Sequence, residues 1–422
     1  MKIKPILLAL AAMCALGAHC APWHWTAPVS GIISTETGGH PTAYLWIDEN
    51  VDSVQALIFA FQNMNEETLF CSPSFREAMA RERIAVLWFA PGFGQEWDIM
   101  QGVQEAFDGA LDSLAARSSH PELASVPLIP FGHSAQATMP WNFTAWNPSR
   151  VLCLVSYHGD SPRTNLCGYG RANVEWGRNR NIDGIPALMV MGEYEWWDAR
   201  LRPAVGFQIW YPHSCISFLG DAGRGHFDLG ADTEAYIVRF IQKSLQARLS
   251  DGKLTEVDPA DGRRLEIPFW SEITVDGHRP TFWYFDDEML QWTRRRYEET
   301  RGKEACYVNF IGPDGRLLTY NPQAHCKVSA RVIPDTDGNF ELSAVFCDST
   351  RTTVDERRDP SEIEIKYVSG PAEQTGHNRF KVDPTHPTWD NPRRRAKVTL
   401  VAEAPATATS KSAIQEIEIT VE

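Results

Sequence analysis

The chain has 422 residues, which is long enough for a full-sized catalytic core and a smaller second domain, because single cores rarely grow beyond about 250–300 residues. Hydrophobic residues make up 43% of the chain and charged residues 22%, as in folded globular proteins and unlike long disordered chains. With 54 acidic against 40 basic side chains, the formal net charge of -14 argues against a nucleic acid as partner.

The N-terminal stretch MKIKPILLALAAMCALGAHCAP has the pattern of a secretory signal peptide. A short basic start precedes an apolar run from Ile6 to Leu16, and small residues follow up to Ala21. We expect residues 1–20 to be removed and the protein to be secreted or periplasmic in a bacterium. No later stretch approaches the roughly 18 uninterrupted apolar residues of a transmembrane helix, so we expect no membrane span.

Nine cysteines in an exported chain permit disulfides without requiring them. The three late ones, Cys306, Cys326 and Cys347, are odd in number, so at most one pair forms among them. None of the cysteines has the short paired spacing of a zinc site. We expect no metal and no other cofactor.

Residues 43–248 alternate apolar runs with amphipathic stretches, which is typical of an α/β fold with a doubly wound, mostly parallel sheet. Several runs are apolar throughout, as in strands that helices cover on both faces. Helical spacing of apolar residues occurs over 100–119 and 231–249. The expected strands are TAYLWID, VQALIFAF, IAVLWFAP, VPLIPFG, RVLCLVSYHGD, PALMVMGEYE and CISFLGD.

After about Arg248 the chain becomes rich in turn formers and charge, which indicates a domain boundary. Short strand-like runs with turn residues between them follow towards the C-terminus and favour a small immunoglobulin-like β-sandwich. We expect a catalytic domain over 22–250, a connecting α+β extension over 251–335 and the β-sandwich over 336–422. The PATATSKSA stretch is expected to be the loop of a final hairpin.

The stretch PFGHSAQATMPW places Ser134 between an expected strand and an expected helix. A serine at such a sharp turn projects its hydroxyl over the sheet edge, with free helix N–H groups behind it. This arrangement resembles the nucleophile elbow of the α/β-hydrolase superfamily, G-x-S-x-G. Gly132 supplies the first glycine of that pattern, whereas Gln136 stands where the second is expected.

Residues downstream resemble the other members of a hydrolase triad, which follow the serine in the order acid, then histidine. The resemblance assigns His226, in the glycine-rich loop GDAGRGHFD after the last strand, as general base. The strand IPALMVMG is followed by three carboxylates within reach. We choose Glu195 as the acid because Gly192 sets the spacing found in related enzymes, and Asp198 is the alternative.

The resemblance places an oxyanion hole at the backbone N–H of Ala135 and at one N–H of the turn after the strand VQALIFAF, for which Met64 is the expected donor. Glu66 and Glu67 in the same turn either cap the following segment or line the site, with the structural role favoured. Substrate contacts are expected from Gln136 and from loop tryptophans near the site, since flat aromatic rings suit sugars. These tryptophans are Trp97, Trp141 and Trp196.

Residues 30–248 resemble secreted bacterial hydrolases related to polyhydroxybutyrate depolymerases and to feruloyl or acetyl xylan esterases. The resemblance implies a serine esterase that cleaves carboxylic esters through an acyl-enzyme, with acyl groups on a polysaccharide as expected substrate. A secreted serine peptidase is the enzymatic alternative, because the same triad cleaves amides. A hydrolase fold that has lost catalysis and binds a partner is the third reading, motivated by Gln136 and the unusual oxyanion turn.

Overall fold

A computed structural model describes residues 23–34, 37–165, 172–195, 197–312, 314–318, 328–385 and 397–421. The expected signal peptide, Trp196 and Cys326 lie outside these described residues. No helix within the described ranges is long and apolar enough to cross a membrane.

The first half of the chain forms an eight-stranded sheet in the order β1-β2-β4-β3-β5-β6-β7-β8. β1 and β2 pair antiparallel, as do β2 and β4, and every other pair is parallel. The sheet is therefore mostly parallel and doubly wound, as the sequence predicts. Its strands are β1 (Trp25–Pro28), β2 (Thr42–Trp46), β3 (Ala56–Phe61), β4 (Ile84–Ala90), β5 (Leu128–His133), β6 (Leu154–Tyr157), β7 (Pro186–Gly192) and β8 (Cys215–Asp221).

The central strands are apolar throughout because both faces of the sheet are covered. Every residue of β3, β5, β6, β7 and β8 is buried. Alternate residues of β3 point to two separate cores. Ile58 packs in one with α2 (Pro73–Arg81) and α6 (Ala231–Arg248), and Phe59 packs in the other with α3 (Val103–Ser118). The helices of this part are α1 (Glu66–Cys71), α2 (Pro73–Arg81), η1 (Ile99–Gln101), α3 (Val103–Ser118), η2 (Pro121–Ala124), η3 (Ser134–Gln136), α4 (Met139–Trp146), α5 (Trp197–Trp210) and α6 (Ala231–Arg248).

A connecting stretch after α6 packs beside β8 and ends in a helix. Tyr284 and Tyr297 of this stretch hydrogen-bond to the backbone of β8. Arg296 of its helix forms a buried ion pair with Asp221 at the end of β8. The stretch contains β9 (Leu249–Ser250), β10 (Lys253–Leu254), η4 (Pro259–Asp261), β11 (Arg263–Glu266), β12 (Thr281–Tyr284) and α7 (Asp287–Thr300).

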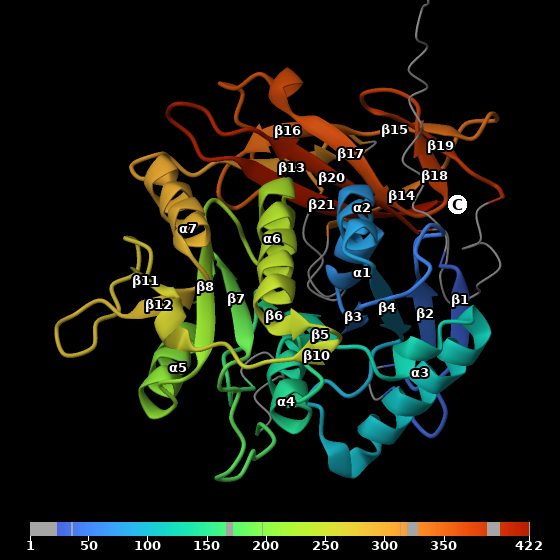
Figure 1. The fold of residues 1–422 in the computed structure, drawn as a ribbon. Helices are drawn as coiled ribbons and strands as arrows, with labels where there is room; N and C mark the ends of the chain where they lie inside the picture. Colours follow the sequence, from blue (N-terminus) through green and yellow to red (C-terminus); the bar gives the residue numbers. More distant parts are fainter. Residues whose placement is uncertain are drawn as a thin grey trace, which may run out of the picture.

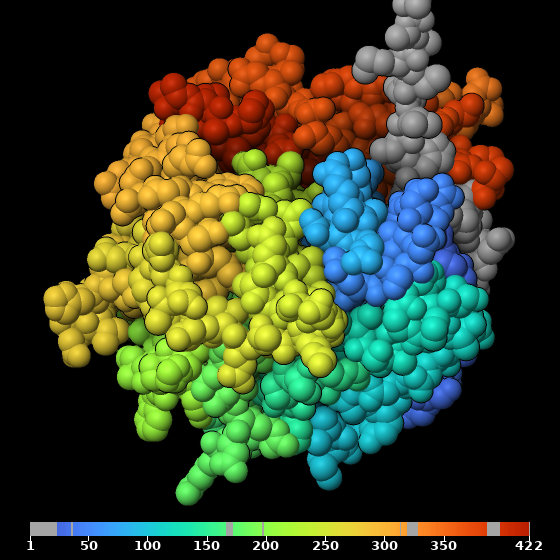
Figure 2. All heavy atoms as spheres, in the orientation of Figure 1, coloured from blue at the N-terminus to red at the C-terminus, as the bar shows by residue number. Residues whose placement is uncertain are grey.

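The remaining strands form a third part with its own apolar core. Figure 1 shows them, in orange and red, gathered along one edge of the first part, and Figure 2 shows the two parts in close contact. These elements are β13 (Tyr307–Ile311), β14 (Val328–Val332), β15 (Asn339–Glu341), β16 (Ser343–Cys347), η6 (Pro360–Glu362), β17 (Glu364–Ser369), β18 (Ala372–Gln374), β19 (Arg379–Val382), β20 (Lys397–Ala404) and β21 (Ala413–Val421).

The third part begins earlier than the expected boundary at residue 336. Val308 of β13 and Val328 of β14 pack in the same core as the later strands, and β14 pairs with β21. The boundary at 336 therefore cuts through one core and belongs near residue 304. We refer to residues 304–421 as the C-terminal domain. β14 and β21 run parallel while β20 and β21 form the predicted final hairpin, and the immunoglobulin-like topology stays a prediction.

Candidate active site

Ser134 lies at a sharp turn between β5 and α4, as the elbow pattern predicts. Its backbone φ of +53° is in the left-handed region, which is uncommon for a residue with a side chain. Two glycines make room for this turn. A Cβ on Gly132 would lie 2.2 Å from the carbonyl oxygen of Gln136, and a Cβ on Gly159 would lie 1.9 Å from Cβ of Ala137.

The contact at Gly132 explains why Gln136 is tolerated where glycine is expected. The close approach between strand and turn involves the backbone carbonyl of Gln136 and not its side chain. The residue is 3% exposed, and its side chain points towards the loop after β4, where Nε2 lies 3.0 Å from the position of a Cβ on Gly92. Gln136 therefore departs from the sequence pattern without disturbing the turn.

Ser134, His226 and Glu195 lie within hydrogen-bonding distance in series. Ser134 Oγ is 2.6 Å from Nε2 of His226, and Nδ1 of His226 is 2.7 Å from Oε2 of Glu195. Their backbones come from the turn after β5, the loop after β8 and the turn after β7, which all leave the carboxyl edge of the parallel sheet. This geometry allows the imidazole to accept the hydroxyl proton at one nitrogen while it donates to the carboxylate from the other.

Asp198, the alternative acid, lies apart from His226. It is in the first turn of α5 and forms an exposed ion pair with Arg202 one turn later at 3.4 Å. Its side chain is 66% exposed, whereas that of Glu195 is 3% exposed. Of the two carboxylates, only Glu195 is brought to the imidazole.

Glu195 is a buried carboxylate with several donors. Burial alone would raise its pKa, but the imidazoles of His158 and His226 and the N–H of Gly192 outweigh that effect and lower the pKa below its usual value of 4.5. The Gly192 N–H donates to Oε1 at 2.8 Å. Glu195 is therefore held ionised near neutral pH, as an acceptor for imidazole must be.

Two further histidines, not predicted from the sequence, contact this group. His158, directly after β6, is fully buried and places Nδ1 3.0 Å from Oε1 of Glu195 and 2.9 Å from the carbonyl oxygen of His226. His133 places Nε2 2.8 Å from the same carbonyl. The position of His158 at the carboxyl end of the strand beside β5 is the signal that would have found it.

The turn after β3 differs from the expected oxyanion hole. The N–H of Met64, the expected second donor, donates to Oε2 of Glu66 at 2.7 Å and is engaged in this structure. Oε1 of the same buried carboxylate accepts from the N–H of His133 at 2.9 Å, so Glu66 ties the turn to the end of β5. Neither bond caps the following segment, which is the structural role expected for Glu66. Ala135 is the first residue after Ser134 in η3, where helical N–H groups have no intrahelical acceptor.

Two of the tryptophans expected to contact substrate belong to the core instead. Trp97 is fully buried and stacks on Phe61, with their ring centroids 6.1 Å apart. Trp141 is also fully buried, and its Nε1 donates to the carbonyl oxygen of Asp160 at 2.7 Å. The expectation that these two rings line a sugar site is therefore wrong, because tertiary packing encloses them.

A group of histidines is the one set of possible metal ligands among the described residues. Ring nitrogens of His133, His158 and His226 lie within 4.8 Å of one another. Both nitrogens of His226 already face Ser134 and Glu195. A metal bound to all three rings would separate His226 from those partners, so these residues fit a hydrogen-bonded site better than a metal centre.

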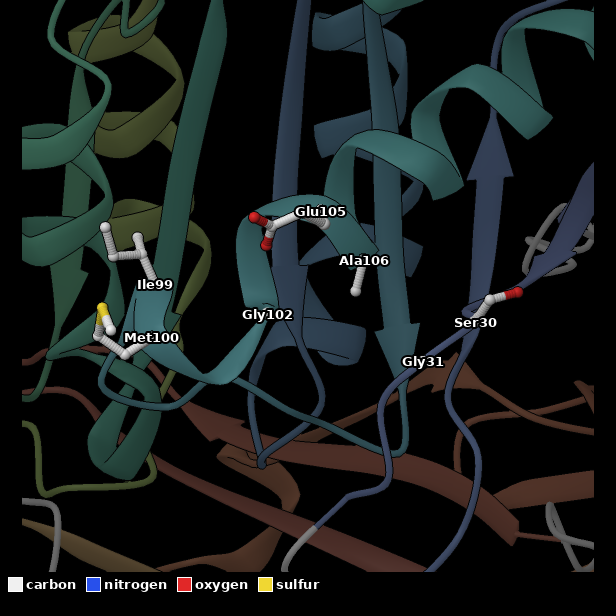
Figure 3. Close-up of a pocket in the computed structure, with 7 residues that line it drawn as sticks. All are labelled: Ser30, Gly31, Ile99, Met100, Gly102, Glu105 and Ala106. Carbon is white, nitrogen blue, oxygen red and sulfur yellow. The ribbon is translucent and has the colours of Figure 1, made fainter.

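Two surface hollows lie outside the triad. One, of about 510 Å³, has Ile99 and Met100 on one side and Ser30 and Gly31 on the other, with the start of α3 between them (Figure 3). The other, of about 730 Å³, is lined by side chains that include Arg150. Neither hollow is lined by Ser134, His226 or Glu195.

The five described cysteines are all buried thiols: Cys71, Cys153, Cys215, Cys306 and Cys347. Burial raises the pKa of Cys347 to about 12, which keeps the thiol protonated at neutral pH. None of them is a candidate nucleophile.

No protein-family profile matches the sequence, and no curated protein does. Solved structures with a similar fold include an S-formylglutathione hydrolase from Staphylococcus aureus, which is 10% identical over 52% of this chain and 98% of that chain, with a TM-score of 0.35. A dienelactone hydrolase from Anabaena variabilis is 16% identical over 54% of this chain and 98% of that chain, with a TM-score of 0.33. Esterase PE8 is 14% identical over 48% of this chain and 97% of that chain, also with a TM-score of 0.33. These similarities are too distant to identify a substrate.

Proposed function

We propose that the protein is a serine hydrolase that cleaves carboxylic esters through an acyl-enzyme. The observation that carries this proposal is the continuous series of hydrogen bonds from Ser134 through His226 to Glu195. A serine in a strained turn with a buried, ionised carboxylate behind its histidine is the arrangement that activates a hydroxyl nucleophile.

In the proposed reaction, His226 Nε2 takes the proton of Ser134 as Oγ attacks the ester carbonyl carbon. The N–H of Ala135 stabilises the negative charge that develops on the carbonyl oxygen. His226 then gives the proton to the departing alcohol, and the C–O bond breaks to leave an acyl-serine. Water repeats the sequence and releases the acid. Throughout, Glu195 accepts from Nδ1 of His226 and stabilises the imidazolium.

In its finer form, the proposal is that the substrate is a polysaccharide that carries acyl groups. The protein would act on it outside the cytoplasm, after residues 1–20 have been removed. The support for this form is the signal-peptide pattern. Trp97 and Trp141 lie in the core and give no support to a sugar substrate.

Hydrolysis assays on the mature chain test the proposal. We expect activity on p-nitrophenyl acetate that Ser134→Ala reduces at least about 1000-fold without lowering the melting temperature. Acetylated xylan, a feruloyl ester and a peptide amide then distinguish polysaccharide ester, other ester and amide substrates. Cleavage of the amide alone would favour the peptidase, and no cleavage of any of the four would favour a binding protein.

A further inference from the structure

The C-terminal domain contacts the two loops that carry Glu195 and His226. Lys411, at the end of the β20–β21 hairpin loop, forms an ion pair with Glu193, two residues before Glu195. The two side chains are only 10% and 12% exposed. Their attraction is therefore less screened by water than that of a surface pair.

Glu193 lies where the two loops are joined. Its second oxygen, Oε2, accepts from the N–H of Gly223 at 2.8 Å, and its own N–H donates to the carbonyl oxygen of Asp221 at 2.9 Å. The next residue, Tyr194, donates its N–H to the carbonyl oxygen of Arg224 at 3.0 Å. The turn of Glu195 and the loop of His226 thus form one hydrogen-bonded unit, and Lys411 contacts it at Glu193.

Further contacts from the C-terminal domain flank His226 on both sides in the sequence. Arg224 is buried, and its Nη2 lies 4.0 Å from Oε1 of Glu403 in β20. Nη2 of Arg351 lies 3.7 Å from Oδ2 of Asp228, and that oxygen also accepts from the N–H next to His226, that of Gly225, at 2.7 Å. The charges of the C-terminal domain are therefore complementary to those of the loop.

The backbones also approach closely at this contact. A Cβ on Gly223 would lie 2.8 Å from the carbonyl oxygen of Ser412, and Gly223 has φ of +73°. Only glycine fits this position without strain or displacement of the hairpin loop. The ring of Tyr194 lies 5.3 Å, centroid to centroid, from that of Tyr307 in β13.

We propose that the C-terminal domain positions the acid and the histidine of the triad, and that Lys411 is its principal positioning residue, acting through Glu193. This inference rests on the proposed function. Because Glu195 and Glu193 share one short turn, movement of Glu193 shifts the carboxylate that orients His226. A displacement of about 1 Å at such a group can cost about 100-fold in rate.

The test compares full-length variants that fold as stably as the wild type. Lys411→Met removes the ion pair, Lys411→Arg retains the charge, and Lys397→Met removes a lysine whose partner Glu418, 2.6 Å away, is in the same domain. For each we measure the melting temperature, the rate of labelling by a fluorophosphonate probe, and kcat and KM on p-nitrophenyl acetate. We expect kcat and labelling of Lys411→Met to fall at least about tenfold with KM within about twofold, and the other two variants to stay within about threefold of wild type.

Equal kcat and labelling rates for wild type and a folded Lys411→Met would overturn the inference and leave the proposed function intact. So would loss of activity in Lys397→Met of the same size as in Lys411→Met. If Lys411→Met does not fold, Lys411→Gln takes its place with the same expected loss, because it also removes the charge that pairs with Glu193 but keeps a polar side chain. A wild-type protein that does not react with the probe would refute both proposals.

Discussion

His158 Nδ1 lies 3.0 Å from Oε1 of Glu195, so the carboxylate that contacts His226 through one oxygen is held by a second imidazole through the other. His158 also contacts the carbonyl oxygen of His226 itself. His158 thus contacts both Glu195 and His226 and orients them, in addition to the contact that these two residues make with each other.

Replacing His158 should slow catalysis without changing substrate binding. Its φ of +46° is tolerated by glycine and asparagine, so His158→Gly removes the imidazole without backbone strain and His158→Asn keeps a donor. We expect kcat on p-nitrophenyl acetate to fall about 10–100-fold in His158→Gly, and less in His158→Asn, with KM little changed. Equal losses in both variants would show that the donor at this position is irrelevant.

Gln136→Gly restores the usual elbow pattern and should leave the fold intact, because the tight contact involves only the backbone of Gln136. The substitution empties the space between the elbow and Gly92, so we expect the ratio of kcat/KM between acetyl and longer acyl esters to change at least about threefold. Gly132→Ala is the contrasting variant, since its Cβ would meet the Gln136 carbonyl, and it should lower stability strongly. If this ratio is unchanged for every pair of esters tested, Gln136 is a tolerated departure from the glycine pattern and has no role in substrate preference.

Arg296→Met should destabilise the protein because it leaves the buried carboxylate of Asp221 without its ion pair. Burial raises the pKa of Asp221, and Arg296 and Arg224 reverse that effect and lower it. We expect a loss of about 3–5 kcal/mol in the free energy of unfolding, measured by urea denaturation. Arg294→Met removes an exposed pair on the same helix and should cost less than about 1 kcal/mol. Similar losses in the two variants would contradict the importance of the buried pair.

Stability should fall on the acid side of pH 4.5 partly because of Glu195. Its pKa is lowered in the folded protein, so its ionised form stabilises the fold above the unfolded-state pKa, and this contribution disappears as pH drops through the folded-state pKa. In Glu195→Gln the free energy of unfolding should therefore depend less steeply on pH below 4.5 than in wild type. Urea denaturation at several pH values measures both slopes, and identical slopes would contradict the lowered pKa.

The apolar runs and the triad order could be predicted from the sequence because they depend on local pattern. All seven expected strands between residues 42 and 221 occur in the sheet, and the two stretches with helical spacing form α3 and α6. By contrast, α5 was not predicted; it contains Pro203, which ordinarily argues against a helix interior. The spacing from Gly192 favoured Glu195, and the structure brings it to His226.

The remaining features depend on contacts between distant segments. Whether Met64 can serve an oxyanion depends on where the buried carboxylate of Glu66 points, and that carboxylate also accepts from the N–H of His133, far along the chain. Trp97 and Trp141 have the flat aromatic rings that suit a sugar site, but both rings are buried in the core. The contact of Lys411 with Glu193 joins residues far apart in the chain, so no local pattern predicts it.

Labelling with a fluorophosphonate probe, followed by mass spectrometry of the modified peptide, tests the central claim most directly. We predict one equivalent of probe on Ser134, no labelling of Ser134→Ala, and labelling at least about 100-fold slower in His226→Ala. An unlabelled wild type, or labelling that persists unchanged in Ser134→Ala, would contradict the assignment of this chain as a serine hydrolase with Ser134 as its nucleophile.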